Sequence, residues 1–505
     1  MRRGDAMVRA VYPSGSQQAS MVLRVFVFSA FVLPTDTVIR VIGAQGYVAS
    51  LVSMLLFAAW AVTAIFGFHD PVHTRHPTRA ALGLLWISSL LSYAAMPFYL
   101  PDETQRLSAE RWMMLLVGMS GVILVAAEHL RTPADLVRVV RTLVWGGSFS
   151  AVVAVIQFWL HWDLRPFLRL LLVGFSASDD YTGFQDRAAL VRVSGTANHP
   201  IEFGLIATML LPIAIWLAFY ERDRPAARRW GPVVLIGLCI PMSVSRSAIL
   251  AVVVSLGIFV ICLPVVQRAW VLAVAPFGIV AVFATTPGYM TTIVSSIFAG
   301  KSDSSITNRL DNYPRVVAFV SQAPWLGRGG GTYLAPDATK ILDNQYLKSA
   351  IELGLFGVFA LVVYFLVPAV TALVARHRSA EPNFRSLCGA LAGACLAAGV
   401  GSYTFDSFSF PQFASVDAMV VGLCGACFLG ASRWPHGLPP ATEIRRRAPL
   451  LKRVASRDEE PPRNPAPSRH TASTGDSAPP GEPTSTRPSR TEPVGRSPLL
   501  PESRF

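Results

Sequence analysis

Apolar runs recur along most of this chain and are separated by shorter polar segments. Most of the runs contain about twenty residues, enough for a helix to cross a hydrocarbon core of about 30 Å. The pattern predicts an all-α, polytopic membrane protein of about twelve transmembrane helices. The predicted spans are Met21–Pro34, Gly46–Phe66, Arg79–Tyr99, Trp112–Leu130, Leu136–Leu160, Pro200–Tyr220, Gly231–Ser245, Ser247–Val265, Ala269–Thr286, Ser349–Ala375, Arg385–Tyr403 and Pro411–Ala431.

The longest polar interruption of this pattern covers about residues 287–348. Connections of this length are uncommon and are usually either functional or disordered. This one contains aromatic residues, glycines and a periodic apolar piece, so we predict a large folded loop on the extracytoplasmic side.

Two further segments on that side are predicted to be helices that lie on the membrane surface, namely His161–Phe175 and, more weakly, Arg315–Trp325. In the first, apolar side chains such as Phe167 recur at helical spacing on one face, and Arg165 and Arg169 point away from that face.

The charges of the connections predict the topology. With the N-terminus inside, the cytoplasmic connections such as HDPVHTRHPTR and ERDRPAARR are basic, and the opposite set is mixed or acidic. We therefore predict a cytoplasmic segment at 1–20, a transmembrane domain at 21–432 and a cytoplasmic tail at 433–505. The tail is rich in Pro, Ser, Arg and Thr and is expected to be disordered, because it cannot bury enough apolar surface to offset its conformational entropy.

Composition agrees with a membrane location. The chain is 52% hydrophobic and 15% charged, against roughly 25% charged in soluble domains. Its net charge of +13 is concentrated in short connections and in the tail, so it indicates contact with membrane lipid and no nucleic-acid partner.

Three arginines on the predicted outer side are the first candidates for chemistry. Arg192 precedes a span, Arg246 lies in a tight turn between two spans, and Arg309 belongs to the large loop. A guanidinium presents a planar fork of donors that matches phosphate oxygens, so arginines that converge would bind an anion. Alternatively, each arginine reaches lipid phosphate or pairs with a carboxylate such as Asp186 or Asp311.

Asp343 is the candidate general base, since it lies at the end of the large loop where it could take a proton from a sugar hydroxyl. The alternative is that Asp343 caps the helix that follows. The glycine cluster Gly327–Tyr333 could approach phosphates with its backbone, but it lacks a strand-turn-helix setting. Asn198 and His199 precede a helix, where such residues commonly cap and pack. No residues have the spacing of a metal site, so we expect neither a metal nor another cofactor.

In combination, the motifs RVSGTANHP, SVSRSA, NRLDNYPRVVAFVSQAPWLGRGGGTY and DNQYLKSAIELGLFG resemble the O-antigen ligase and polymerase family of bacterial polysaccharide enzymes. The resemblance covers roughly residues 183–364. It implies a metal-independent, inverting glycosyltransferase of the plasma membrane, active on its outer face in the biosynthesis of exopolysaccharide or cell-surface polysaccharide. Its partners would be a donor glycan linked to undecaprenyl diphosphate and a glycan or lipid-glycan acceptor.

The same resemblance assigns roles to residues. The arginine of its R-x-x-G-T motif and the arginine of its S-R turn hold the diphosphate and correspond to Arg192 and Arg246, with Arg309 as a further candidate. The H-N-x-x-L pattern of the ligases is Asp343-Asn344-Gln345-Tyr346-Leu347 here, so Asp343 stands where the catalytic histidine would be. This departure favours a polymerase, or a ligase to another acceptor, over a lipopolysaccharide ligase. The expected supporting residues are Asn344, Tyr346, Asn198 and His199.

Two other functions fit a polytopic chain of this kind. One is a transporter or flippase of a lipid-linked glycan, although transporters usually have paired halves and a site at the bilayer midplane. The other is a peptidoglycan-type polymerase, which also uses an outward-facing acid.

Overall fold

The computed structural model of the chain describes residues 15–39, 42–177, 185–187, 190–285, 304–337, 340–435 and 437–442. All of them belong to one compact unit, Met1–Lys452. The predicted N-terminal segment up to residue 14, residues 286–303 of the predicted large loop and the predicted tail from residue 443 lie outside the described residues.

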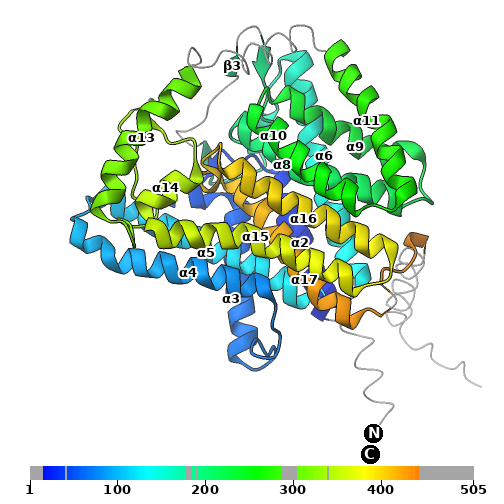
Figure 1. Cartoon of the computed structure of the whole chain (residues 1–505), viewed down its shortest axis with the longest axis horizontal. Helices are drawn as coiled ribbons and strands as arrows, with labels where there is room; N and C mark the ends of the chain where they lie inside the picture. The colour runs from blue at the N-terminus through cyan, green and yellow to red at the C-terminus, as the bar shows by residue number, and fades with distance from the viewer. Residues whose placement is uncertain are drawn as a thin grey trace, which may run out of the picture. The chain divides into compact units, whose positions relative to one another are not determined.

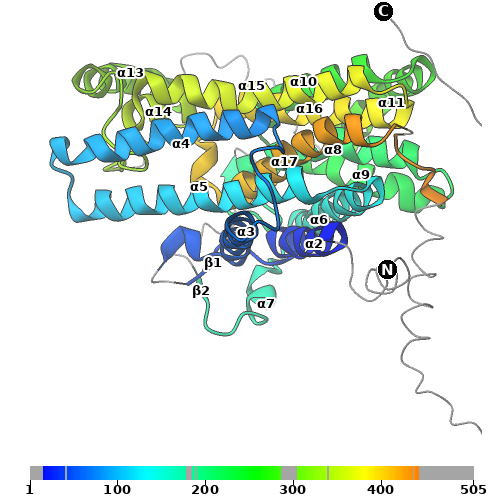
Figure 2. The ribbon, with the colours of Figure 1, turned by 90° about the horizontal axis from the view of Figure 1, so that it is seen from below.

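The described part of the chain is predominantly helical (Figures 1 and 2). The helices are α2 (Gly15–Val32), α3 (Val48–Ile65), α4 (Pro77–Ala95), α5 (Glu103–His129), α6 (Pro133–Leu160), α7 (Arg165–Arg169), α8 (Pro200–Tyr220), α9 (Ala226–Met242), α10 (Arg246–Cys262), α11 (Val265–Thr285), α13 (Ser304–Gln322), α14 (Gln345–Glu352), α15 (Gly354–Arg378), α16 (Pro382–Ser402) and α17 (Pro411–Arg433), and the 3-10 turns are η1 (Gly43–Gly46), η2 (Met96–Tyr99) and η5 (Ser407–Ser409).

Strands are few and short in the described residues. β1 (Thr37–Val38) pairs antiparallel with β2 (Ser176–Ala177), and β3 (Gln185–Arg187) pairs antiparallel with β4 (Leu190–Arg192). They join connections between helices, and the helices form the core.

Each predicted span coincides largely with one helix. Eight helices of the described part are long and apolar enough to cross a membrane: α3, α4 with η2, α5, α6, α8, α15, α16 and α17. The fold is therefore that of a multi-pass, mostly helical membrane protein. The remaining predicted spans correspond to α2, α9, α10 and α11.

Packing follows from the composition of each helix. α8 is apolar on all sides and is buried almost throughout, in contact with α9, α10, α16 and α17. α16 is built mainly from Ala, Gly, Ser and Cys and packs on both α10 and α15, as expected when small residues let helix backbones approach closely.

Hydrogen bonds join connections that lie at the same end of the helices. The connections joined in this way belong to the same set, basic or mixed, that the loop charges predict. At one end, here called the site end, Thr35 N donates to Thr196 O (3.3 Å) and Gln105 Nε2 donates to Thr332 O (3.3 Å). At the opposite end, Trp216 Nε1 donates to Asn383 O and Trp434 Nε1 donates to Arg131 O, both at 2.8 Å. The start of the predicted tail therefore packs on this opposite end.

The first predicted surface helix is shorter than predicted. Only Arg165–Arg169 is helical in that segment. Arg165 is buried because Asp163 pairs with its guanidinium (2.8 Å), whereas Phe167, Leu170 and Leu171 are exposed. The periodicity identified an apolar surface but not the buried ion pair beside it.

Candidate active site

Arg192 and Arg246 belong to one local structure at the site end. Arg192 ends β4, and its Nε donates a hydrogen bond to the backbone oxygen of Ser243 (3.1 Å). Ser243 begins the turn between α9 and α10, and Arg246 is the first residue of α10. The next residue of the β4 chain is also docked there, because Val193 N donates to Met242 O (3.4 Å). The structure therefore brings together the segments that carry these two arginines.

The connection after Arg192 is fixed by buried polar side chains from α6 and α7. Gln157 exchanges two hydrogen bonds with the backbone of Gly195, at 2.8 and 2.9 Å. Arg165 donates to Ser194 Oγ (3.2 Å), and Thr196 Oγ1 donates to Ser150 Oγ (2.8 Å). Gly195 has φ +60°, and a Cβ there would lie 2.7 Å from the Ser150 carbonyl oxygen. The R-x-x-G-T pattern is thus a rigid support for the Arg192 strand.

His199 caps α8, as expected from the sequence. Its Nδ1 accepts from Ile201 N (3.1 Å), which places the ring proton on Nε2. Burial, together with the nearby Arg192 charge, lowers the pKa of His199 to about 4. A neutral imidazole whose lone pair is already bonded is a poor general base, and the observed hydrogen bond makes His199 the cap of α8.

Asn198 contributes through its backbone to a site that sequence reasoning missed. Asn198 N donates to Glu202 Oε2 (3.0 Å), and Phe413 N donates to Glu202 Oε1 (3.0 Å). One buried carboxylate in the first turn of α8 therefore binds an amide just before that helix and an amide in the first turn of α17, where helix dipoles favour negative charge. An acidic residue within an otherwise apolar span was the available signal.

Asp343 does not cap α14, so the cap interpretation is wrong. Asn344 is the N-cap, and its Oδ1 accepts from Tyr346 N (2.9 Å) and Leu347 N (3.1 Å). Asp343 is half-buried and precedes this cap by one residue. Tyr346 ties the first turn of α14 to α16 by donating from its hydroxyl to Gly399 O (2.9 Å).

The connection between α16 and α17 links the two groups of candidate residues. On one side, the ring of Phe410 lies 5.7 Å from the ring of His199. On the other, Gln345 Oε1 accepts from Phe408 N (2.9 Å), and Lys348 Nζ pairs with Asp406 Oδ2 (2.9 Å). His199 and the first turns of α14 therefore border the same segment, residues 403–410.

Lys348 and Asp406 form a strong brace for α14. Burial alone would lower the pKa of Lys348, but the charges of Asp406 and Glu352 raise it above its usual value. Lys348 also donates to Ser409 Oγ (2.7 Å). The brace fixes α14, and so the position of Asp343, against the connection between α16 and α17.

The remaining expected residue, Arg309, lies within α13. Its side chain is outside the described part of the structure. The described part contains no group of three or more His, Cys, Asp or Glu side chains that could hold a metal ion.

The glycine cluster Gly327–Tyr333 wraps the end of α14. Gly329 N donates to the Glu352 carbonyl oxygen (2.9 Å), and a Cβ on Gly327 would lie 2.2 Å from that oxygen. Gly327 is thus explained by close approach of the backbone to α14, whereas a Cβ on Gly330 or Gly331 would instead meet Trp112 or Ser108 of α5. The Glu352 carboxylate accepts from Tyr333 N (3.2 Å), and burial raises its pKa to about 7.

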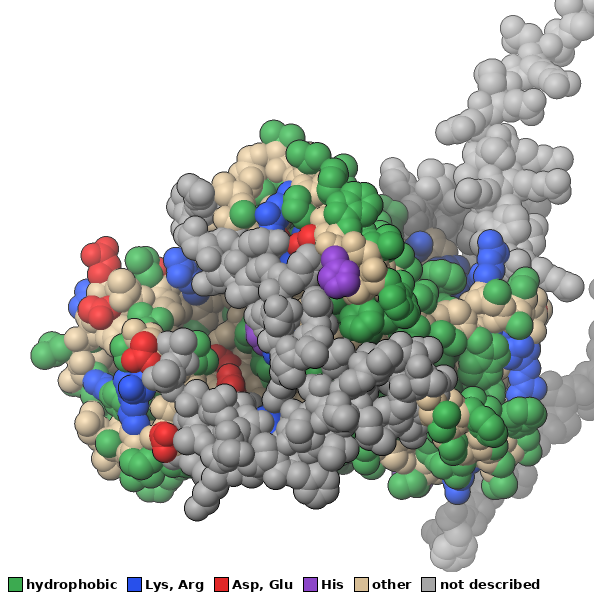
Figure 3. Space-filling view, turned by 90° about the horizontal axis from the view of Figure 1, so that it is seen from above, with side chains coloured by type: hydrophobic (Ala, Val, Ile, Leu, Met, Phe, Trp, Pro, Cys, Tyr) green, Lys and Arg blue, Asp and Glu red, His purple; other side chains and the backbone are tan. Residues whose placement is uncertain are grey.

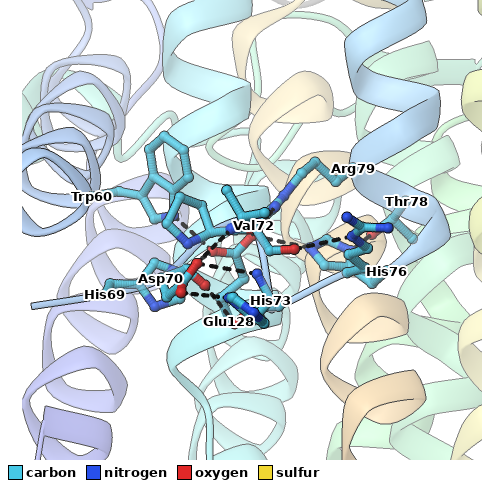
Figure 4. Close-up of polar contacts among 12 residues, drawn as sticks. Trp60, His69, Asp70, Val72, His73, His76, Thr78, Arg79 and Glu128 are labelled. Carbon is cyan, nitrogen blue, oxygen red and sulfur yellow. Dashed lines mark hydrogen bonds and ion pairs between the residues drawn. The ribbon is translucent and has the colours of Figure 1, made fainter. Parts of the chain in front are cut away.

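A second polar cluster lies at the opposite end, around Glu128 of α5 (Figure 4). Its carboxylate binds Trp60 Nε1 (2.8 Å), His69 Nε2 (2.5 Å), His76 Nε2 (3.2 Å) and Arg79. These partners belong to α3, α4 and the connection between them. The cluster therefore anchors that connection to α5, and sequence reasoning missed it because its members are distant along the chain.

Charged side chains of both signs gather at the site end. Figure 3 views the molecule from the top of Figure 1 and shows Lys or Arg and Asp or Glu side chains on the left, the side on which α13 and α14 lie. Hydrophobic side chains predominate on the right of the view.

Part of the chain matches a known family. Residues 231–362 match the family model described as O-Antigen ligase. The matched part contains Arg246, Arg309, Asp343, Asn344 and Tyr346, whereas Arg192, Asn198 and His199 precede it. No curated protein matches the chain.

Proposed function

Because residues 231–362 place the chain in an O-antigen ligase/polymerase-like family, we propose that it transfers or polymerises glycan units carried on undecaprenyl diphosphate. The reaction takes place on the outer face of the plasma membrane, during biosynthesis of a cell-surface polysaccharide or exopolysaccharide. The observation that carries the proposal is the bond from Arg192 to Ser243, since it joins the segments of both candidate phosphate-binding arginines.

Arg192 and Arg246 hold the diphosphate of the donor. Guanidinium groups form charge-assisted, often paired hydrogen bonds with phosphate oxygens. Negative charge grows on the diphosphate as it leaves, so these bonds strengthen toward the transition state. The two cations supply the charge neutralisation for which other sugar transferases use a divalent ion. Arg309 is a further candidate for the same role.

Asp343 acts as the general base. Its carboxylate takes the proton of the acceptor hydroxyl while the acceptor oxygen forms a bond to the anomeric carbon. The bond from that carbon to the diphosphate oxygen breaks, and undecaprenyl diphosphate leaves with the electron pair. Attack from the face opposite the leaving group inverts the anomeric configuration. Asn344 supports this role, because it takes over the helix cap that Asp343 would otherwise provide.

The membrane placement follows from the loop charges. Twelve spans with both termini in the cytoplasm put the basic connections of the opposite end inside and the site end outside. α2, α9, α10 and α11 then complete the set of spans. In this orientation a lipid-linked donor reaches Arg192 and Arg246 laterally from the outer leaflet.

The proposal is tested by replacing Arg246 or Arg192 with Ala in a strain whose own copy has been deleted. Because each arginine stabilises the leaving diphosphate, each variant is expected to lose most polymer, by roughly tenfold or more. Polymer amount and length are measured on gels at matched protein levels. Arg222→Ala is the matched control, because Arg222 is an exposed arginine at the opposite end. Wild-type polymer from both Arg192 and Arg246 variants would refute the proposal.

A further inference from the structure

A pocket at the site end contains two arginines that the proposed reaction does not use. It is lined in part by Tyr99, Gln105, Arg315, Phe319, Arg328 and Tyr333. These residues come from η2, the first turn of α5, α13 and the glycine cluster, elements that lie together on the left of Figures 1 and 2.

The two guanidiniums converge on one aromatic ring. Arg315 lies 5.7 Å from the centre of the Phe319 ring, and Arg328 lies 5.1 Å from the same centre. Each also contacts a tyrosine ring, Arg315 that of Tyr333 (5.9 Å) and Arg328 that of Tyr99 (5.8 Å). These contacts use the positive charge and leave the N–H donors of the guanidiniums for other partners.

No carboxylate neutralises this pair within the described residues, where neither Arg315 nor Arg328 forms an ion pair. The Glu352 carboxylate lies behind the glycine cluster and is bound by Tyr333 N. Two like charges that share one ring repel each other, and an anion in the pocket would relieve that repulsion. The pocket is therefore built for an anionic group.

The pocket also carries the groups that bind sugars. Aromatic rings offer flat apolar faces to the C–H side of a pyranose, and here Phe319 and Tyr333 meet edge to face at 6.1 Å. Gln105 supplies an amide that is held in place by Asp102 N and Thr332 O. Apolar ring faces beside a few oriented polar groups are typical of small-molecule sites.

The position of the pocket ties it to Asp343. Tyr333 Oη donates to Lys340 O (2.8 Å), close to Asp343 along the chain. Ile351, another lining residue, packs with Leu342 and Val316 in a small core. The pocket wall and the Asp343 segment therefore share support, whereas the Arg192 and Arg246 segments meet elsewhere, at the turn between α9 and α10.

We propose that this pocket binds an anionic sugar residue, one that bears a carboxylate or a phosphate, so that the glycan handled by this chain is acidic. The proposal rests on the proposed function for the identity of the glycan. Arg315 and Arg328 bind the anionic substituent, and the rings of Phe319 and Tyr333 bind the sugar face. The site determines specificity and takes no part in bond breaking.

The test is equilibrium binding without turnover, on the purified full chain in nanodiscs of neutral lipid. The probes are tetragalacturonate and its carboxyl-reduced, neutral counterpart. Wild-type protein is expected to bind the acidic probe at least roughly tenfold more tightly, because charge-assisted hydrogen bonds are lost with the neutral probe. Arg315→Gln and Arg328→Gln are each expected to remove roughly that factor. Arg106→Gln, at an exposed position in the first turns of α5, is expected to bind as wild type.

Two further measurements complete the test. Raising the salt concentration is expected to weaken binding of the acidic probe to wild-type protein, so the result does not depend on the folding of a variant. Nanodiscs that contain phosphatidylglycerol separate a lipid headgroup from a sugar. If anionic lipid displaces the acidic probe, the pocket is a lipid site and the proposal is overturned, as it is by equal affinity for the two probes. Transfer activity plays no part in this readout, so it is independent of the test on Arg246.

Discussion

The structure changes the interpretation of Asp343. Its two interpretations, cap and base, compete only if the helix begins at the next position. Asn344 makes both cap hydrogen bonds, so the carboxylate of Asp343 is not needed to start α14. The proposed catalytic role is thereby separable from the role of N-cap.

Replacing Asp343 with Asn is expected to lower glycan transfer by roughly 10²- to 10⁴-fold, because the amide cannot take the acceptor proton. Asn344→Ala is the contrasting variant and is expected to lose about 1 kcal/mol of stability with the loss of its cap. Transfer rates at saturating donor and thermal melts in detergent report the two effects. Full transfer by Asp343→Asn would exclude Asp343 as the base.

Glu352 is expected to make the stability of the folded protein depend on pH. Its pKa is about 7 in the folded protein against 4.5 ordinarily, so the folded state retains a proton that the unfolded state has lost between these values. The contribution of Glu352 to the free energy of unfolding is therefore greatest below about pH 4.5. It falls by up to about 3 kcal/mol as the pH rises to about 7, and it is constant at higher pH.

The measurement compares thermal melts of wild type and Glu352→Gln from pH 5 to 8. The glutamine keeps the acceptor for Tyr333 N, and its stability is expected to change less over this range than that of the wild type. Parallel pH profiles for the two proteins would show that Glu352 does not titrate in the folded state.

The sequence was sufficient to select individual candidate residues, but it did not show which residues they contact in the folded protein. Arg192 and Arg246 could be selected because arginines are unexpected on the outer side of a membrane protein. Arg165 was assigned to a surface, because its partner Ser194 is brought to it only by the fold, although Asp163 lies two positions away along the chain. Glu202 and Glu352 are visible in the sequence as acidic residues in or beside apolar spans, but the amides of Phe413 and Tyr333 that bind them come from other elements and have no local signal.

Among the elements, the connection between α3 and α4 is anchored by a single side chain. Glu128 binds partners from α3, from α4 and from the connection itself (Figure 4). Removing one member of a buried ionic cluster leaves its partners buried and unpaired.

Glu128→Ala is therefore expected to destabilise the protein by about 3–5 kcal/mol. Molecules that remain folded are expected to keep their transfer activity, since the cluster lies at the end opposite the candidate active site. Asp70→Asn is the matched control, because Asp70 is an exposed carboxylate in the same connection and binds only local groups such as His73. Its melting temperature is expected to equal that of the wild type. A wild-type melt for Glu128→Ala would show that the anchor is not needed.

The hydropathy of the sequence located the helices along the chain, but it did not show which elements pack together. Apolar length located α8, α15 and α17 because a span must satisfy its own backbone hydrogen bonds in lipid. The same pattern failed at α7, where turns replace the predicted longer helix. The docking of β4 on the turn between α9 and α10 joins residues 51 positions apart and has no sequence signal of its own.

For the molecule as a whole, the alternation of basic and mixed connections was the most informative sequence property. It grouped connections that the structure places at the same ends of the helices, as the contacts of Thr35 with Thr196 and of Trp216 with Asn383 illustrate. Which helices become neighbours could not be derived, since each apolar span satisfies hydropathy equally well beside any other. The central place of α8 agrees with its apolar surface on all sides.

The most direct test of the account is equilibrium binding of undecaprenyl diphosphate to purified protein in nanodiscs of neutral lipid. If Arg192 and Arg246 hold the diphosphate, replacing either with Ala is expected to weaken binding by roughly tenfold or more. Arg222→Ala is expected to bind as wild type does. Equal affinity of the wild type and of both the Arg192 and the Arg246 variants would contradict the account.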